Sequence, residues 1–380
     1  MIAYRRETRA VSAEHPTEGG TGLTDTREVR PTEHLEWPAL AAYLREHLAP
    51  IDIPGLDRRA LAREMQFRQF PGGHSNLTYL VRFGEVELVL RRPPLGPVAP
   101  RAHDMAREYA WLRALNDLFP LAPRPYLLCD DPGPIGSVFY VMERRKGFIL
   151  RHEEPPALLD RHVARRRTSE AFIDGLVTLH AIDVTTGPLA SLGKPAGFVE
   201  RQITGWRDRW HRVQTASVPE MDDVGRWLSA NRPPANAPPA VVHGDFKLDN
   251  VMFRSDDLTK IVAVLDWEMS ALGEPLVDLG MLLACWAPTG PPSHQDALAT
   301  VTERPGWFTK EEIVARYAKG SGRDVSAIRY FETLALFKLA AIIQQIFYRY
   351  LRGQTDDPRF AHFGERVVYL ARAAAELAGA

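Results

Sequence analysis

Two short segments in the second half of the chain carry residues that could perform phosphoryl transfer. Residues 243–250 read HGDFKLDN, and residues 262–268 read VAVLDWE. Phosphoryl transfer from ATP needs an acceptor hydroxyl aimed in line and a divalent metal that neutralises the triphosphate. Asp245 could take the hydroxyl proton, and Asn250, five residues later, could present its amide oxygen to Mg²⁺. This spacing indicates a phosphoryl-transfer centre; the alternative is an Asp/Asn turn satisfied by its own backbone.

Four further polar residues flank this pair. Asp266 follows an apolar run and could be a second magnesium ligand, although an isolated aspartate fits a helix N-cap equally well. Lys247 could contact the transferring phosphate or could be a solvated charge. We interpret His243 as an anchor of the loop rather than a base. Asp278 lies among apolar residues, and we expect it to hold a loop by hydrogen bonds, as buried carboxylates usually do.

The first half of the chain offers residues that could bind a nucleotide. Residues 71–79 read PGGHSNLTY, and the two glycines would let backbone amides approach phosphates closely. Arg91 ends the apolar run ELVLR and could reach the α- and β-phosphates. Glu108 could hold Arg91 in an ion pair. The alternative for both residues is a solvated surface charge, which is the usual fate of Arg and Glu.

The elements that must position these residues can be predicted from hydrophobic periodicity. An amphipathic helix is expected over 34–48 and a longer helix over 101–118. Strands are expected at 66–70, 77–83, 85–91, 125–129 and 137–143, with a hairpin turn at Phe83-Gly84. Together these elements make a small sheet with one long helix packed on it.

The remainder of the chain is mainly helical. Helices are expected at 168–182, at 198–213 and from 274 onward, with a buried core helix at 329–351. The Pro-rich stretch 231–240 is a stiff connector that leads into short strands around the HGDFKLDN loop. We therefore predict an α+β fold of two lobes. Its parts are a mobile polar tail (1–30), an N-terminal nucleotide-binding lobe (31–143) and a helical C-terminal lobe with the catalytic and metal-binding loops (144–380).

Composition excludes several classes of function. The net charge of −1 provides no global field for nucleic acid or for a membrane surface. The sequence contains no run of about 18 apolar residues, so we expect no transmembrane helix. The segment MIAYRRETRA lacks the apolar stretch of a signal peptide. Cys129 and Cys285 show no zinc or redox spacing, and a cytoplasmic location is the simplest expectation.

Taken together, these motifs resemble the aminoglycoside phosphotransferase-like superfamily, which includes choline kinase-like small-molecule kinases and is related to protein kinases. HGD, Asn250 and LDWE resemble its catalytic loop and metal-binding segment. The phrases FPGGHSNLTYLV, LVLRRPP, REYAWLRAL and FYVMERRKG look like a subgroup that includes kinase-like domains fused to acyl-CoA dehydrogenases. The resemblance covers about residues 35–355 and implies a protein-kinase-like fold and ATP with Mg²⁺ as cofactors.

The resemblance also implies a role for individual residues. Asp245 is similar to the catalytic base, with Asn250 and Asp266 as the magnesium ligands. Glu143 falls at the hinge between the lobes, where family members bind adenine through the backbone. The residues that look like the phosphate-covering loop are Gly72, Gly73, His74, Ser75 and Asn76. Glu108 matches the helix glutamate of the ion pair, whereas its partner Arg91 departs from the lysine of most relatives, and a guanidinium is not a general substitute for an ammonium.

Charge is the one clue to the acceptor. Residues 144–167 hold eight Lys and Arg against three Asp and Glu, and residues 194–212 hold a second basic group. Clustered arginines suit phosphates or carboxylates, so we hypothesise an anionic acceptor such as a hydroxyacyl-CoA; the alternative is a solvated face. An aminoglycoside-modifying kinase and a kinase-like module that binds nucleotide without turnover remain open. The sequence DWE in place of DFG makes a protein kinase the least expected reading. The oligomeric state is left open.

Overall fold

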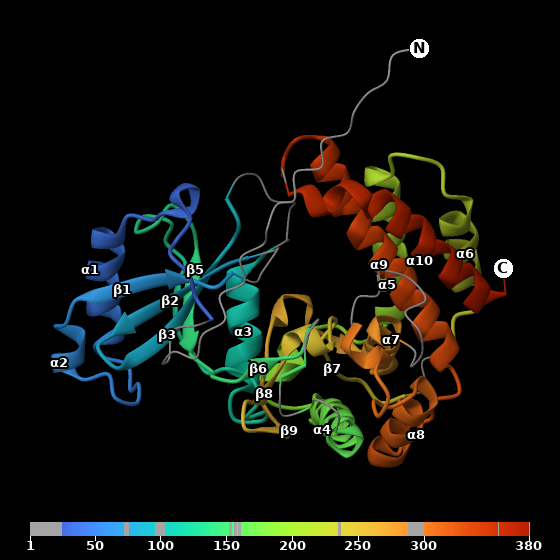
Figure 1. Ribbon diagram of the computed structural model, residues 1–380, viewed down its shortest axis with the longest axis horizontal. Coiled ribbons are helices and arrows are strands. Elements are labelled where there is room, and N and C mark those ends of the chain that lie inside the picture. Colours follow the sequence, from blue (N-terminus) through green and yellow to red (C-terminus); the bar gives the residue numbers. More distant parts are fainter. Residues whose placement is uncertain are drawn as a thin grey trace, which may run out of the picture.

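A strand-rich lobe and a mainly helical lobe lie side by side in this protein (Figure 1). The computed structural model describes residues 25–71, 76–95, 103–151, 154–155, 158, 161–234, 237–287, 300–355 and 357–379. Within these ranges the predicted α+β architecture is confirmed: the smaller lobe is built on an antiparallel sheet with one long helix, and the larger lobe is mostly helical.

The small lobe contains a five-stranded antiparallel sheet with the order β1-β2-β3-β5-β4. Its strands are β1 (Met65–Gln69), β2 (Leu77–Phe83), β3 (Val86–Arg92), β4 (Pro125–Cys129) and β5 (Phe139–Glu143). Each predicted strand is present, with ends that differ by two residues or fewer. The β2–β3 turn uses Gly84 at a φ of +62°, a left-handed conformation that glycine adopts without steric cost. In the register, Arg91 lies opposite Tyr140 of β5, which places Arg91 in the middle of the sheet.

Helices cover both faces of this sheet. On one face lie α1 (Trp37–Leu48) and α2 (Arg58–Leu61), after the short helix η1 (Pro31–Glu33). The other face meets α3 (Met105–Leu115), which begins where the Asp104 carboxylate accepts the backbone N–H of Arg107. Residues of α3 belong to the same hydrophobic core as the large lobe, so α3 joins the two lobes (Figure 1). We predicted a helix over 101–118. Within the described residues, which begin at 103 here, the helix starts two residues later and ends three residues earlier than predicted.

The first described residues lie against β1. Arg27 forms a β-bridge with Gln69, and Val29 is buried among residues of α1 and the sheet. Residues 25–30, which we assigned to the tail, are thus packed. The extent of a mobile tail and the lobe boundary at 143 remain predictions.

Short strands in the large lobe present the loops that carry the candidate chemistry. β6 (Phe148–Ile149), β8 (Val251–Arg254) and β9 (Asp257–Val264) form a three-stranded sheet. β7 (Ala240–Val242) pairs with β10 (Ala271–Gly273). The HGDFKLDN loop connects β7 to β8 through the short helix η3 (Leu248–Asn250), and a second short helix, η4 (Trp267–Met269), follows β9. The predicted strands around the loop are confirmed.

Helices make up the rest of the large lobe. They are α4 (His162–His180), η2 (Pro188–Ser191), α5 (Phe198–Val213), α6 (Pro219–Ala230), α7 (Leu276–Cys285), η5 (Thr300–Glu303), α8 (Lys310–Ser321), α9 (Ile328–Leu351), η6 (Pro358–His362) and α10 (Phe363–Ala378). The sequence predicted α5 and α9 closely, gave α7 only as part of a helical region from 274 onward, began α4 six residues late and missed α6. One helix, α9, is long and apolar enough to cross a membrane, but 72% of its most apolar stretch is buried, as expected of a core helix.

Candidate active site

The loop between β7 and η3 is held by a buried carboxylate on α7. The Asp278 Oδ2 atom accepts the backbone N–H of His243 at 2.6 Å, and Oδ1 accepts that of Gly244 at 2.7 Å. His243 is buried, and its Nε2 atom bonds to the Leu265 carbonyl oxygen at 3.0 Å. Burial lowers the pKa of His243, so a neutral imidazole anchors the loop. The predicted structural roles of His243 and Asp278 agree with this geometry.

Asp245 lies in this loop, and its carboxylate is surrounded by two lysines and one asparagine amide. Lys247 Nζ is 2.9 Å from Asp245 Oδ2, and Asn250 Nδ2 donates to the same oxygen at 2.9 Å. Burial would raise the pKa of Asp245, but Lys247 and Lys338 outweigh burial and lower it. The aspartate is therefore a carboxylate at neutral pH. Because the Asn250 amide nitrogen is bound to Asp245, its amide oxygen is the atom left to face a metal.

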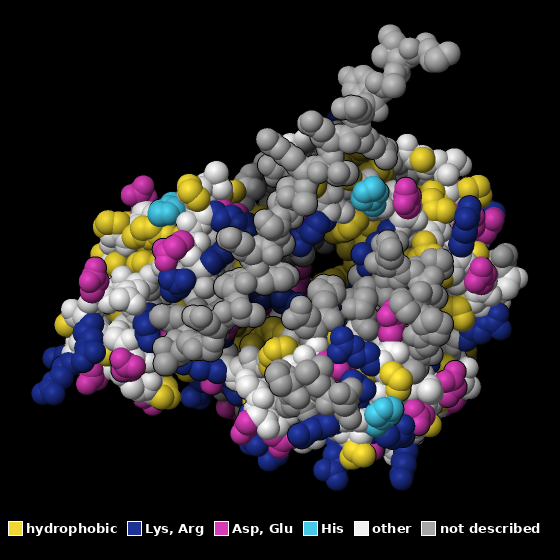
Figure 2. Space-filling model, viewed as in Figure 1, with side chains coloured by type: hydrophobic (Ala, Val, Ile, Leu, Met, Phe, Trp, Pro, Cys, Tyr) yellow, Lys and Arg dark blue, Asp and Glu magenta, His cyan; other side chains and the backbone are white. Residues whose placement is uncertain are grey.

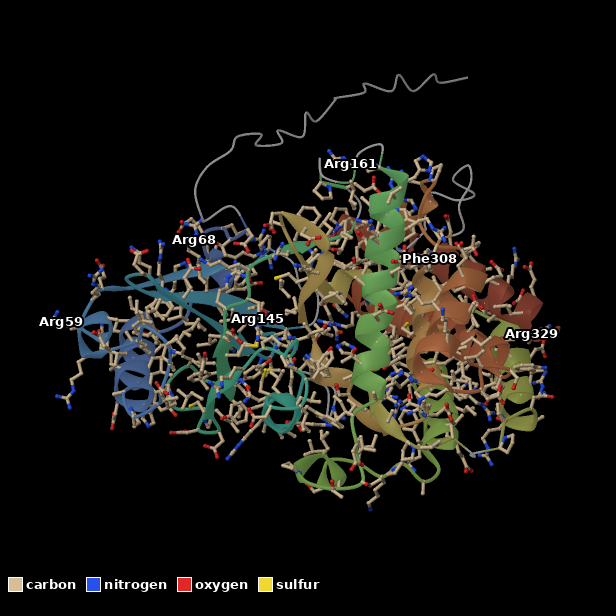
Figure 3. All side chains as sticks on the ribbon, turned by 90° about the horizontal axis from the view of Figure 1, so that it is seen from below. Arg59, Arg68, Arg145, Arg161, Phe308 and Arg329 are labelled. Carbon is tan, nitrogen blue, oxygen red and sulfur yellow. The ribbon has the colours of Figure 1, made fainter. Side chains whose placement is uncertain are left out.

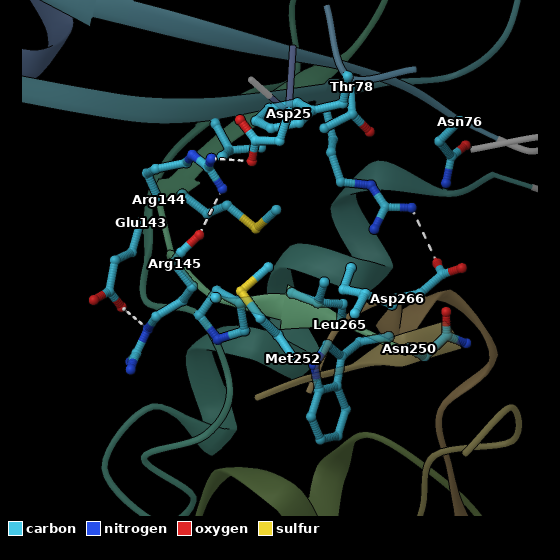
Figure 4. Close-up of a pocket in the computed structure, with 18 of the residues that line it drawn as sticks. Asp25, Asn76, Thr78, Glu143, Arg144, Arg145, Asn250, Met252, Leu265 and Asp266 are labelled. Atoms are coloured by element: carbon cyan, nitrogen blue, oxygen red, sulfur yellow. Dashed lines mark hydrogen bonds and ion pairs between the residues drawn. The ribbon is translucent and has the colours of Figure 1, made fainter. Parts of the chain in front are cut away.

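Asp266 lies beside Asn250 across the β8–β9 pair. The backbone N–H of Leu265 donates to the Asn250 carbonyl oxygen at 2.8 Å, so the residue that follows is fixed next to Asn250. In Figure 4 the Asn250 amide oxygen points toward the Asp266 carboxylate, which faces the Arg91 guanidinium. Asp266 precedes η4 but its side chain makes no capping bond there; instead it accepts from Arg91 at 3.0 Å. Asp245 is bonded to Asn250, and Asp266 follows Leu265, whose backbone N–H is bonded to Asn250, so the three residues lie near one another.

The Arg91–Glu108 ion pair is present and buried. Arg91 NH1 is 2.9 Å from Glu108 Oε1, and the side chains are 9% and 1% exposed. Burial raises the pKa of Glu108 to about 7, and Arg91 opposes that rise. The sequence-based alternative of solvated surface charges is therefore wrong for both residues.

A cavity of about 410 Å³ between the lobes is lined by Arg91, Glu108, Asn250 and Asp266, and Asp245 lies behind Asn250, outside the lining. In Figure 2 the face between the lobes is hollowed, and Lys and Arg side chains border the hollow. Apolar walls come from both lobes, including Val89, Met142, Met252 and Leu265. Glu143 lies at one end and is 2.9 Å from Arg145 Nε (Figure 4). The cavity combines apolar walls with convergent polar and charged groups, as small-molecule and cofactor sites do.

Buried polar atoms in this cavity lack a partner among the residues that the structure describes. They are Asn76 Oδ1 and Arg91 Nε. Buried polar atoms are rarely left unpaired unless a ligand or water completes them. A nucleoside triphosphate offers acceptor oxygens, and the waters on its Mg²⁺ are hydrogen-bond donors. These groups could pair with the unpartnered donors and acceptors of the cavity, so the residues present fit ATP and Mg²⁺.

The structure describes only the end of the predicted phosphate-covering loop. Gly72, Gly73, His74 and Ser75 lie outside the described residues. Asn76, the last residue of the loop, is buried and donates to Glu268 Oε2 at 3.0 Å. The end of the loop is thus linked to the DWE segment of the other lobe.

The sequence reasoning missed two residues of the site. The Glu268 carboxylate accepts a hydrogen bond from the Asn76 amide and lies 3.3 Å from His103 Nδ1. The sequence feature that could have identified Glu268 is its position two residues after Asp266. Lys338 is buried in α9, donates to the Gly244 carbonyl oxygen and lies 5.5 Å from the centre of the Trp206 ring. A single lysine inside an apolar core helix was the signal that could have found it.

The arginine-rich stretch is only partly available to an acceptor. Arg165 is buried and binds Glu154 through two nitrogens, at 2.9 and 2.8 Å. Arg304 and Trp307 also donate to Glu154, so this cluster is structural. The inclusion of Arg165 among substrate-binding arginines is therefore wrong.

Other arginines of the stretch have different surroundings. Arg166 pairs with the exposed Glu312, and Arg161 lies at the exposed end of α4, whereas Arg145 lies between the lobes (Figure 3). Arg151 lines the inter-lobe cavity. The charge of the stretch is therefore divided between the core, the surface and the cleft.

Comparisons with known proteins agree with this geometry. A model of the phosphotransferase enzyme family matches residues 66–313. Mouse acyl-CoA dehydrogenase family member 11 is 35% identical over 339 residues, which cover 88% of this chain and 42% of that protein. The chain thus spans less than half the length of this relative.

Solved structures extend the comparison. A putative aminoglycoside phosphotransferase from Ralstonia eutropha JMP134 aligns with a TM-score of 0.73 and 27% identity, covering 91% of this chain and 99% of that one. Aminoglycoside phosphotransferase APH(4)-Ia, solved in a complex with AMP-PNP and hygromycin B, aligns with a TM-score of 0.55 and 13% identity, covering 90% and 99%. The second likeness shows the shared fold alone. These structures confirm the predicted fold.

Proposed function

The chain belongs to the phosphotransferase enzyme family and is a phosphotransferase with an alcohol acceptor; from this premise we propose that it transfers the γ-phosphate of ATP to a hydroxyl of a small molecule. The observation that carries the proposal is the position of Asn250 and Asp266 on the wall of the inter-lobe cavity, with Asn250 bonded to the Asp245 carboxylate. It supplies a carboxylate for the hydroxyl and oxygen ligands for a metal in one place.

Each residue of the loop has a distinct task in this proposal. Asp245 orients the acceptor hydroxyl and takes its proton late in the transfer. Burial opposes the charge of Lys247, but Asp245 raises its pKa, so the ammonium persists and can stabilise charge on the transferring phosphate. Asn250 and Asp266 would hold Mg²⁺, which when bound neutralises the triphosphate charge.

The small lobe would bind and orient the nucleotide. The hinge backbone that begins at Glu143 would bind adenine, and Val89 and Met252 would cover its faces. Arg91, held by Glu108, lies at the phosphate end of the cavity. Gly72 to Asn76 would cover the phosphates, as the resemblance implies. A rigid arrangement of these groups before binding lowers the barrier by positioning.

For the acceptor we favour an anionic hydroxylated molecule, with a hydroxyacyl-CoA as the named class. Lys247 lies 2.9 Å from Asp245 and is partly exposed, so it would put a cation beside the acceptor hydroxyl. Arg151, on the wall of the inter-lobe cavity, is a second cation that an anionic ligand could meet. A polycationic aminoglycoside would meet repulsion there. The mouse relative is named as an acyl-CoA dehydrogenase family member, which agrees with an acyl-CoA acceptor.

The test is ATP turnover against a panel of acceptors. The panel contains hydroxyacyl-CoAs, the matching free hydroxy acids, neutral sugars and aminoglycosides, and the control is Asp245→Asn. We expect turnover with the hydroxyacyl-CoAs that disappears in the variant. Turnover with aminoglycosides alone would favour a drug-modifying kinase, and ATP binding without turnover on any acceptor would favour a binding module.

Partners and location follow the same proposal. We propose a small-molecule substrate with no nucleic-acid or membrane partner, because the net charge is −1 and the apolar helix α9 is mostly buried. A cytoplasmic location is part of the proposal and would be tested by fractionation of cells that express the full-length protein.

A further inference from the structure

The Arg91 guanidinium is bound by two carboxylates at the same time. Its NH1 atom is 2.9 Å from Glu108 Oε1, and its NH2 atom is 3.0 Å from Asp266 Oδ1. The three residues come from β3, α3 and the turn after β9, and 175 residues separate Arg91 from Asp266. A planar guanidinium suits this geometry because its nitrogens donate in fixed directions. Arg91 therefore links the small lobe to the candidate metal ligand.

A fourth residue closes this contact into a ring. The backbone N–H of Trp267 donates to Glu108 Oε1 at 3.2 Å, the same oxygen that binds Arg91. The Trp267 indole is buried and donates to the Val264 carbonyl oxygen at 2.9 Å. Glu108 therefore fixes the backbone directly after Asp266, and Arg91 fixes the Asp266 side chain.

Asp266 needs this support because its backbone is strained. Its φ of 68° and ψ of 69° lie in the left-handed region, which a residue other than glycine rarely adopts. Such a conformation persists when the surrounding contacts determine it, and it often marks a functional position. Here it turns the carboxylate toward the Arg91 guanidinium and leaves it next to the Asn250 amide (Figure 4).

We propose that Arg91 is a positioning residue: it holds the strained Asp266 turn in the metal-binding geometry before nucleotide arrives. This inference rests on the proposed function, because it takes Asp266 as a metal ligand. Arg91 binds Oδ1 and leaves Oδ2 for the cation. Arg91 then acts through Asp266, and its main effect is on the affinity for the metal. Its effect on the affinity for nucleotide phosphates is smaller.

The test measures metal binding without any acceptor. The full chain is titrated with Mn²⁺ at saturating ADP, and free Mn²⁺ is read by electron paramagnetic resonance. ADP binding without metal is measured by calorimetry. For Arg91→Lys we expect Mn²⁺ affinity to fall about tenfold, as for loss of an outer-shell partner of a metal ligand. Metal-free ADP affinity should change by less than about threefold, since phosphate still meets a cation.

A control and a double mutant make the result specific. Arg92→Lys is the matched control, because Arg92 is the next buried arginine of β3 and bonds to the carbonyl oxygens of Pro93 and Ile135, away from the ring. In an Asp266→Asn background, Arg91→Lys should cause no further loss of Mn²⁺ affinity, because the path through Asp266 is already removed.

The inference is overturned by any of three results. They are unchanged Mn²⁺ affinity in Arg91→Lys, an equal loss of metal-free ADP affinity, or a full effect that persists in the Asp266→Asn background. If Arg91→Lys does not fold, Glu108→Gln replaces it, with an expected loss of about threefold from weakening the anchor of Arg91. A wild-type chain that binds no Mn²⁺ with ADP would overturn the proposed function as well, which keeps the two failures distinct.

Discussion

The Asp278 carboxylate accepts the backbone N–H of Gly244 at 2.7 Å, so a buried residue of α7 fixes the turn that leads into Asp245. The same carboxylate accepts the His243 N–H at 2.6 Å. Asp278→Asn keeps the size but replaces one acceptor by an NH₂ group that faces a donor. We expect a loss of about 3 kcal/mol in the free energy of unfolding, measured with urea. Asp324→Asn is the control: Asp324 is exposed and accepts the backbone N–H of Ser326, so the change should be less than about 1 kcal/mol.

Gly244 itself cannot carry a side chain. Its φ is +85°, and a Cβ atom there would lie 2.7 Å from the Met269 carbonyl oxygen. Gly244→Ala should therefore displace the loop and abolish ATP turnover. Gly136→Ala is a matched control, since Gly136 also has a positive φ, +74°, but open space around it. The control should cost only about 1–2 kcal/mol of stability. Equal behaviour of the two variants in activity would contradict the steric argument.

Removal of the Asp245 carboxylate should stop catalysis without unfolding the protein. Asp245→Asn keeps an oxygen that can accept from Asn250, so the loop should survive. We expect kcat to fall by about 10²–10⁴ from loss of the proton acceptor. The measurement is kcat for ATP turnover with the best acceptor of the panel. Asp256→Asn, on the exposed β8–β9 turn, should leave kcat unchanged.

The acid limb of the pH–rate profile should follow the pKa of Asp245, and Lys247 should determine where that limb lies. Burial raises the pKa of Asp245, but Lys247 and Lys338 lower it below its ordinary value, and the reaction needs the carboxylate. In Lys247→Met the pKa of Asp245 rises, so the acid limb of kcat/KM should move to higher pH. Lys260→Met, at an exposed site, should leave the limb in place.

The same shift has a consequence for stability. Because the folded-state pKa of Asp245 is lowered, its contribution to stability is present above its unfolded pKa and is lost as pH falls through the folded pKa. Lys247→Met should reduce this contribution, so the dependence of unfolding free energy on pH becomes shallower in the acid range. A steeper dependence in the variant would contradict the assignment.

Arg165 should matter for folding and not for acceptor binding. It is buried against Glu154, and Arg165→Met leaves that carboxylate with fewer partners. We expect destabilisation of about 3–5 kcal/mol, which is typical when one partner of a buried ion pair is removed. Exposed Arg167→Met should change stability by less than about 0.5 kcal/mol. A stable Arg165→Met protein with a raised KM for the acceptor would return Arg165 to the substrate site.

Much of the fold could be predicted because its signals are local. The apolar runs of β2 and β3, the glycine between them and the apolar length of α9 each depend on neighbours in sequence. Helix α6 was missed, although it has proline in its first turn and acidic residues near its start. The first turn of α4 lacks an apolar stripe because it carries consecutive arginines, and burial of Arg165 with Glu154 lets the helix begin earlier.

By itself the sequence determined which residues could do chemistry: the spacing of Asp245, Asn250 and Asp266 is short, and the intervening strands bring them together. Tertiary structure decided which charges meet. It placed Arg91 on Asp266 as well as Glu108, and it buried Arg165 against Glu154. The physical reason is that backbone conformation follows from nearby residues, whereas ion pairing and burial depend on how elements far apart in the chain pack together.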